Sequence, residues 1–250
     1  MTYEQLHVWL MAFVRSGGLL VLSPVFSGKM IPVPLRIAIA AFLAYVVSGV
    51  ARAAVPLPSD VVGLIFSAAH ELLIGLMMGL GMRLVFFAIE FAGQVISTEI
   101  GLVMSAQIDP ISQTNSTPIG SAFFYFGSLL FLISGAHHAM FVAFLRSFEL
   151  APPGAITAAR NIGELFVHST GNIFVSAIQM AAPIMAINFI VTLTFAVLGK
   201  AAPGINVFSE SFAVRIFAGL TLLGLTLGLT AQLVLSQLRQ SPELMLRLIP

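Results

Sequence analysis

The chain has 250 residues, of which 58% are hydrophobic and 8% are charged, and its mean hydropathy is +1.03. A water-soluble domain carries roughly 25% charged residues, so this composition indicates an integral membrane protein. The net charge of +1 gives no basic face for nucleic acid, and the absence of cysteine excludes disulfides, thiolate catalysis and Cys-ligated metals.

Apolar stretches of helical length follow one another along the chain, each near or above the ~20 residues that cross a bilayer. They cover residues 6–26, 37–55, 61–82, 84–105, 119–145, 172–198 and 212–236. Pro- and Gly-containing segments separate them, because these residues end helices and set turns. We therefore expect one all-helical membrane domain over residues 1–250. We also expect hinges or junctions between bent hairpins at 23–34 and 199–211, where Pro and Gly concentrate.

Charged residues lie inside these apolar stretches, at a cost of at least ~2.5–3.5 kcal/mol for each one at bilayer depth. They must be paired, in contact with water, or outside the hydrocarbon. The first stretch contains Arg15 and the last contains Arg215, and the region 61–105 contains His70, Glu71, Arg83, Glu90 and Glu99. Two interpretations of Glu71, Arg83, Glu90 and Glu99 stay open: a charge network between subunits that serves assembly, or pairs within the chain.

Two pairs of glycines have the spacing that lets helices approach closely, Gly75 with Gly79 and Gly224 with Gly228. We expect both pairs to lie at helix contacts.

A search for catalytic motifs finds none of HExxH, GxSxG or a Walker loop. His137 and His138 are adjacent, cannot share one helix face, and are expected to be packing residues rather than metal ligands. We predict no catalytic residue, no metal and no cofactor. A proton-coupled transporter of a small solute remains an alternative, because carboxylates such as Glu71, Glu90 and Glu99 can relay protons inside membranes.

The stretch IDPISQTNSTPIG, residues 108–120, is polar but almost uncharged, between two apolar segments. At membrane depth such backbone is tolerated only inside protein or facing a water-filled cavity. By composition alone it is an ordinary exposed connector. The candidate site comprises Ile108, Asp109, Pro110, Ile111, Ser112, Gln113, Thr114, Asn115, Ser116, Thr117 and Pro118.

Four blocks of the sequence, in order, resemble the FliR family of flagellar type III export gates, which is related to the SctT family of injectisomes. They are PVFSGKMIPVPLRIAIA (24–40), ELLIGLMMGLGMRLVFFAIEFAGQVIS (71–97), HHAMFVAFLRSFELAPPG (137–154) and NFIVTLTFAVLGKAAPGINVFSESFAVRI (188–216). Ser211-Phe212-Ala213 departs from the family's Gly-Phe-Pro, which leaves the start of the last helix undefined.

The resemblance implies a structural, pore-forming subunit rather than an enzyme: an all-α membrane protein of long, bent helical hairpins. A FliP-like part (1–171) would precede a FliQ-like hairpin (172–250). The implied partners are FliP-like, FliQ-like, FlhB-like and FlhA-like components, unfolded flagellar export substrates and membrane lipid, but no nucleic acid. The implied location is the bacterial inner membrane within the flagellar basal body, partly towards the periplasm. The 108–120 loop would plug the pore. The equivalent subunit of a virulence injectisome is the nearest alternative.

Overall fold

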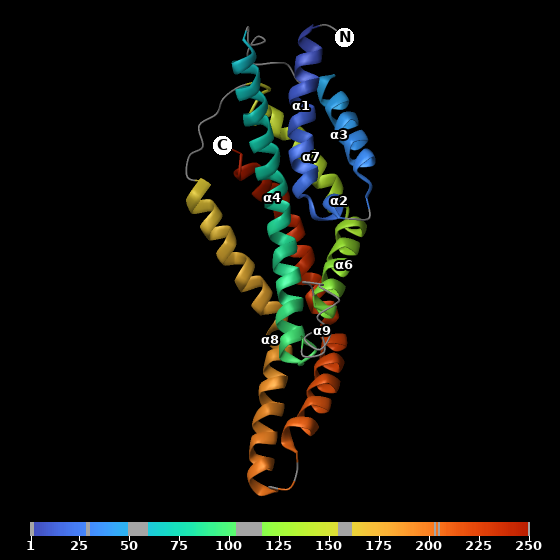
Figure 1. Cartoon of the computed structure of the whole chain (residues 1–250), viewed down its shortest axis with the longest axis vertical. Helices are drawn as coiled ribbons and strands as arrows, with labels where there is room; N and C mark the ends of the chain where they lie inside the picture. The colour runs from blue at the N-terminus through green and yellow to red at the C-terminus, as the bar shows by residue number, and fades with distance from the viewer. Residues whose placement is uncertain are drawn as a thin grey trace. The chain divides into compact units, whose positions relative to one another are not determined.

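The computed structural model describes residues 3–28, 31–49, 60–103, 117–154, 162–202, 204 and 206–249. Every regular element in these ranges is a helix, which confirms the predicted all-α fold (Figure 1). The helices are α1 (Tyr3–Leu22), α2 (Pro24–Ser27), α3 (Val33–Ser48), α4 (Val61–Glu99), α6 (Pro118–Ile133), α7 (Ala136–Leu150), α8 (Ile162–Ala201) and α9 (Val207–Arg247).

The apolar stretches and the helices do not correspond one to one. The predicted stretches 61–82 and 84–105 form one helix, α4, because Arg83 interrupts the hydropathy but not the backbone hydrogen bonds. The predicted stretch 119–145 is instead two helices, α6 and α7, bent by 70°. Gly135 lies at this bend with φ 74°, a left-handed conformation that glycine adopts without strain.

Both predicted junctions interrupt the helices. In the first, α1 ends at Leu22, the short α2 follows, and α3 begins at Val33 after Pro32. In the second, α8 ends at Ala201 and α9 begins at Val207. Ser211 to Ala213 therefore lie inside α9, so the departure from the family's Gly-Phe-Pro does not delay the start of the last helix.

The chain divides into two compact units. Unit 1 comprises residues 1–85, 131–169 and 237–250, and unit 2 comprises residues 86–130 and 170–236. The division at 169/170 lies close to the predicted boundary at 171/172, but each unit also contains a segment from the other side of that boundary. The FliP-like and FliQ-like parts therefore stay a prediction.

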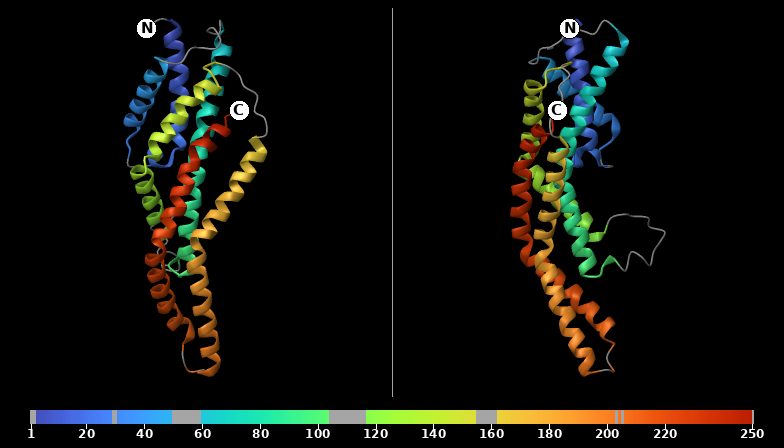
Figure 2. Two further views of the ribbon diagram at one scale, coloured as in Figure 1. Left: turned by 180° about the vertical axis from the view of Figure 1, so that it is seen from behind. Right: turned by 90° about the vertical axis from the view of Figure 1, so that its left-hand side faces the viewer.

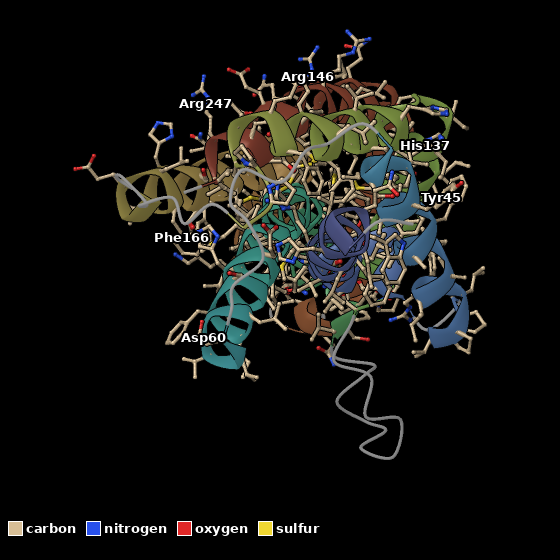
Figure 3. All side chains as sticks on the ribbon, turned by 90° about the horizontal axis from the view of Figure 1, so that it is seen from above. Tyr45, Asp60, His137, Arg146, Phe166 and Arg247 are labelled. Atoms are coloured by element: carbon tan, nitrogen blue, oxygen red, sulfur yellow. The ribbon has the colours of Figure 1, made fainter. Side chains whose placement is uncertain are left out.

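Unit 1 is built around α1, which contacts α3, the first part of α4, and α7 (Figure 1). Ser16 on α1 donates a hydrogen bond from Oγ to the carbonyl of Ala40 on α3, at 3.0 Å. The side chains of Tyr45, Arg146 and Arg247 point outward from this unit (Figure 3). In contrast, Arg15 of α1, Glu71 of α4 and Ser147 of α7 are completely buried.

Unit 2 combines the second part of α4 with most of α6, α8 and α9. The Phe91 ring packs edge-on against Phe174 of α8, with the centroids 5.3 Å apart. The end of α8 and the start of α9 form a hairpin (Figure 2), and a Cβ added at Gly199 would lie 2.9 Å from Val207.

By length and composition, four helices within the described ranges could cross a membrane, or five if the bent pair α6–α7 is one span. The helices α4, α8 and α9 have 39, 40 and 41 residues. At about 1.5 Å per residue each is roughly 60 Å long, about twice the ~30 Å hydrocarbon core. Each therefore has enough length to extend well beyond that core.

Candidate functional site

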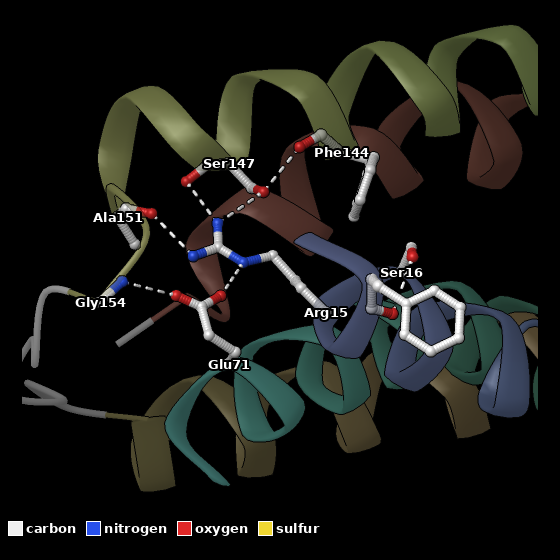
Figure 4. Close-up of polar contacts among 8 residues, drawn as sticks. Arg15, Ser16, Glu71, Phe144, Ser147, Ala151 and Gly154 are labelled. Atoms are coloured by element: carbon white, nitrogen blue, oxygen red, sulfur yellow. Dashed lines mark hydrogen bonds and ion pairs between the residues drawn. The ribbon is translucent and has the colours of Figure 1, made fainter. Parts of the chain in front are cut away.

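Unit 1 contains a completely buried ion pair between Arg15 of α1 and Glu71 of α4 (Figure 4). Nε of Arg15 donates to Oε2 of Glu71 at 2.6 Å, and both side chains are 0% exposed. These two charges are therefore removed from lipid by pairing inside the protein. The sequence leaves two interpretations of Glu71 open, a charge network between subunits or a pair within the chain. This contact is a pair within the chain.

The remaining donors of Arg15 bind the end of α7. Nη1 donates to the carbonyl and to Oγ of Ser147, each at 3.0 Å, and Nη2 donates to the carbonyl of Ala151 at 2.8 Å. The guanidinium carbon also lies 4.0 Å from the ring centroid of Phe148. The Ser147 carbonyl also accepts the Ala151 N–H at 2.9 Å. The carbonyls at the C-terminal end of a helix carry partial negative charge, so a cation there is stabilised.

Glu71 completes the cluster from the other side. Its Oε1 accepts a hydrogen bond from the backbone N–H of Gly154 at 3.1 Å, and Gly154 has φ 79°. Residues 147–154 (SFELAPPG), the end of one of the four blocks that carry the family resemblance, are thus bound by both members of the ion pair. Sequence reasoning named both charges but did not pair them, because 56 positions separate them.

Close packing of α1 on α4 brings the two charges together. A Cβ added at Gly75 would lie 2.1 Å from the carbonyl oxygen of Arg15, and one added at Gly79 would lie 2.7 Å from that of Leu19. The predicted contact at Gly75 and Gly79 is confirmed. In contrast, a Cβ at Gly224 or Gly228 meets nothing within 4 Å in the described part of the chain, so no helix contact of this second pair is found there.

A second group of buried polar contacts lies in unit 2, at the C-terminal turn of α4. Asn188 of α8 donates from Nδ2 to both the carbonyl and the carboxylate Oε2 of Glu99, each at 2.7 Å. Gly101, with φ 85°, ends the helix, and Leu102 N–H donates back to the Ser97 carbonyl at 2.9 Å. This is a Schellman cap, and it fixes the direction in which the chain leaves α4.

Arg83 and Glu90 are half-buried and lie between Glu71 and Glu99 in the sequence of α4. Glu71, Arg83, Glu90 and Glu99 therefore share one helix, but Glu71 and Glu99 are held at different sites. An assembly role for this set stays a prediction.

Residues 108–116, which are most of the proposed plug, lie outside the described residues. Thr117 and Pro118 are described. The helix α6 begins at Pro118, and Oγ1 of Thr117 accepts a hydrogen bond from the Gly120 N–H at 3.1 Å. A Cβ added at Gly93 of α4 would lie 2.7 Å from Cα of Gly120. The first turn of α6 is therefore in tight backbone contact with α4.

That contact gives a testable expectation. Gly93→Ala should destabilise unit 2 by about 1–3 kcal/mol, because the added methyl meets backbone that cannot move aside. The matched control is Gly224→Ala, where the space is open and alanine favours the helix by about 0.8–1.0 kcal/mol. Thermal unfolding of both variants in detergent measures the difference. Equal midpoints would show that the α4–α6 contact is loose.

The rings of His137 and His138 lie close together, with their centroids 4.0 Å apart. Nδ1 of His137 is buried without a hydrogen-bond partner in the described structure. Within the described ranges, no three His, Cys, Asp or Glu residues gather as metal ligands do.

Together, the long apolar helices, the buried ion pair and the capped helix ends define a helical membrane protein whose polar residues hold its helices together. Residues 6–241 match the model of the family described as bacterial export proteins, family 1. The chain belongs to this family.

Similar curated proteins agree with this assignment. The chain is 26% identical to the flagellar biosynthetic protein FliR of Caulobacter vibrioides, over 91% of each chain. It is 30% identical to FliR of Bacillus subtilis, over 83% of this chain and 81% of that protein. It is 24% identical to the surface presentation of antigens protein SpaR of Shigella flexneri, over 85% and 84%. The chain is a membrane-embedded component of the flagellar export apparatus, related to type III secretion.

Proposed function

We propose that the chain is a pore-forming structural subunit of the flagellar type III export gate in the bacterial inner membrane. It assembles with FliP-like and FliQ-like subunits, and unfolded flagellar proteins pass through the assembled pore. FlhB-like and FlhA-like components act with it, and the chain itself catalyses no reaction. The match to the export family over residues 6–241 carries this proposal.

The surface of the long helices supports a role within an assembly. In the most apolar part of α8 only 22% is buried within the chain, and in that of α9 only 6%. Phe189, Phe217 and Leu225 are 68%, 76% and 77% exposed. Lipid can cover about 30 Å of such a helix, so the rest of its apolar surface requires protein. Helices of this length can extend beyond the hydrocarbon, and we place that part of the complex towards the periplasm, as the family resemblance implies.

The 108–118 segment is the proposed plug of the resting pore. Its flanks are suited to hold it, because the Schellman cap at Gly101 precedes it and the Thr117 cap follows it, both in unit 2. Its single charge is Asp109, so entry into a narrow lumen avoids most of the desolvation cost of charged groups. Its hydroxyl and amide groups can exchange water for pore-lining partners with little net change in free energy.

The assembly role of the α4 charges is tested most simply at Arg83. Arg83→Ala should lower recovery of the complex, because it removes a half-buried cation that we assign to a charge network between subunits. Recovery is measured as partner subunits per copy of this chain after affinity purification. Arg247→Ala is the control, because Arg247 is an exposed residue bound to Glu243. If the Arg83 variant assembles at the normal level, Arg83 has no role in assembly.

Export itself is the test of the proposed function. A strain lacking the gene for this chain should secrete no hook or filament protein, and a plasmid copy should restore secretion. If secretion of flagellar proteins is unchanged while uptake of a small solute is lost, the transporter alternative is correct. If secretion of virulence proteins is lost instead, the chain belongs to an injectisome.

A further inference from the structure

Arg215 of α9 lies beside the C-terminal turn of α4, within unit 2. It falls between Phe212, whose ring lies 2.6 Å from a Cβ added at Gly101, and Gly219, whose added Cβ would lie 2.2 Å from Ile100. Positions 212, 215 and 219 share one helix face, because they are three and four residues apart. That face of α9 packs on the end of α4.

Three buried polar atoms around this turn have no hydrogen-bond partner among the described residues. They are Oγ of Ser97, Oδ1 of Asn188 and Nε of Arg215. Ser97 lies near the end of α4 and is completely buried, and Asn188 is bound to Glu99 of that turn through Nδ2. A buried polar atom without a partner is costly, so this turn requires further polar groups next to it.

The segment 104–116, outside the described residues, starts at this turn. It follows Val103 directly and ends at Thr117, just before the helix whose Gly120 contacts Gly93 of α4. Both ends of the segment therefore lie on the last turns of α4. The segment supplies hydroxyl and amide side chains at Ser105, Gln107, Ser112, Gln113, Thr114, Asn115 and Ser116.

Charge identifies the residue of this segment that fits Arg215. The acidic residues of unit 2 are Glu90, Glu99, Asp109 and Glu210. Glu99 accepts from Asn188 and not from Nε of Arg215, and Glu90 precedes Glu99 by about 14 Å along α4. Glu210 is five positions from Arg215, about 140° away around α9. Asp109 is the acid that remains.

We propose that this end of α4 is a docking site for the segment 104–116 of the same chain, and that the Asp109 carboxylate binds the Arg215 guanidinium. Asp109 is the sixth residue beyond the described end of the α4 turn, so it can lie anywhere within about 20 Å of it. A guanidinium binds a carboxylate through two parallel hydrogen bonds. Polar groups of the segment then bind Ser97 and Asn188. The contact is within one chain, so it does not depend on the proposed function.

The first test uses Arg215→Lys in native membranes, because lysine keeps the positive charge. A carbodiimide should join the introduced amine to Asp109, as identified by peptide mass spectrometry after purification through a tag on this chain. Arg239→Lys, which changes an exposed cation of the same helix, is the control and should give no link to Asp109. A link to Glu99 or to another subunit in place of Asp109, or no link at all, would overturn the proposal.

The second test measures amide hydrogen exchange of the segment 104–116 in the material purified through the tag. Arg215→Gln and Asp109→Asn should each raise the exchange rate by at least about tenfold, because each removes hydrogen bonds between charged groups. The double variant should exchange no faster than either single variant, because both changes remove the same contact. Arg239→Gln should leave the rate unchanged. Unchanged exchange in Arg215→Gln, or additive effects in the double variant, would contradict the proposed contact.

Discussion

Arg15→Ala should lower the free energy of unfolding by about 3–5 kcal/mol, the largest loss of stability expected for this chain. The substitution leaves the Glu71 carboxylate buried and unpaired. It also removes the donors bound to the Ser147 and Ala151 carbonyls at the end of α7. Denaturant unfolding of this chain within the complex purified in detergent, followed by a fluorescent label on this chain, measures the effect.

The double variant Arg15→Met, Glu71→Leu separates the cost of an unpaired charge from that of lost packing. It should be more stable than Arg15→Ala alone, because no charge remains buried. Arg247→Ala removes an exposed i,i+4 pair and should cost only about 0.3–0.5 kcal/mol. If Arg15→Ala costs no more than Arg247→Ala, the buried pair does not hold α1, α4 and α7 together.

Removing residues 113–116 should leave the complex assembled but leaky to small ions, the largest functional effect expected. The shortened segment would no longer reach across the lumen that it is proposed to seal. Conductance of the purified complex in a planar bilayer measures this directly.

Removal of residues 155–158, four residues from another connector, is the matched control and should leave the baseline closed. A tight baseline after removal of 113–116 would mean that the segment is only a connector.

Composition predicted the membrane class, because a chain with 8% charged residues cannot cover its surface in water. Apolar runs of about 20 residues predicted that the fold is all-α. Pro and Gly clusters also located the two junctions. The hydropathy pattern failed at Arg83 and at Gly135. A charge lowers the hydropathy of a helix without breaking it, whereas one glycine with positive φ turns the chain without changing its hydropathy.

The buried polar contacts around Arg15 and Glu99 could be predicted only in part. The sequence identified Arg15, Glu71 and Glu99 as costly charges, but their partners depend on tertiary contacts. Arg15 uses backbone carbonyls of Ser147 and Ala151, and a carbonyl leaves no signal in the sequence. Asn188 begins the block 188–216 that resembles the family. Its polar side chain in an apolar run is a signal from which a buried polar contact could have been predicted.

The mass of the complex isolated through a tag on this chain tests the central claim most directly. The chain should be recovered in one stable assembly with two different small hydrophobic subunits, and should be unstable when it is expressed alone. A stable monomer, or a symmetric oligomer of this chain alone, would contradict its role as a structural subunit of an export gate.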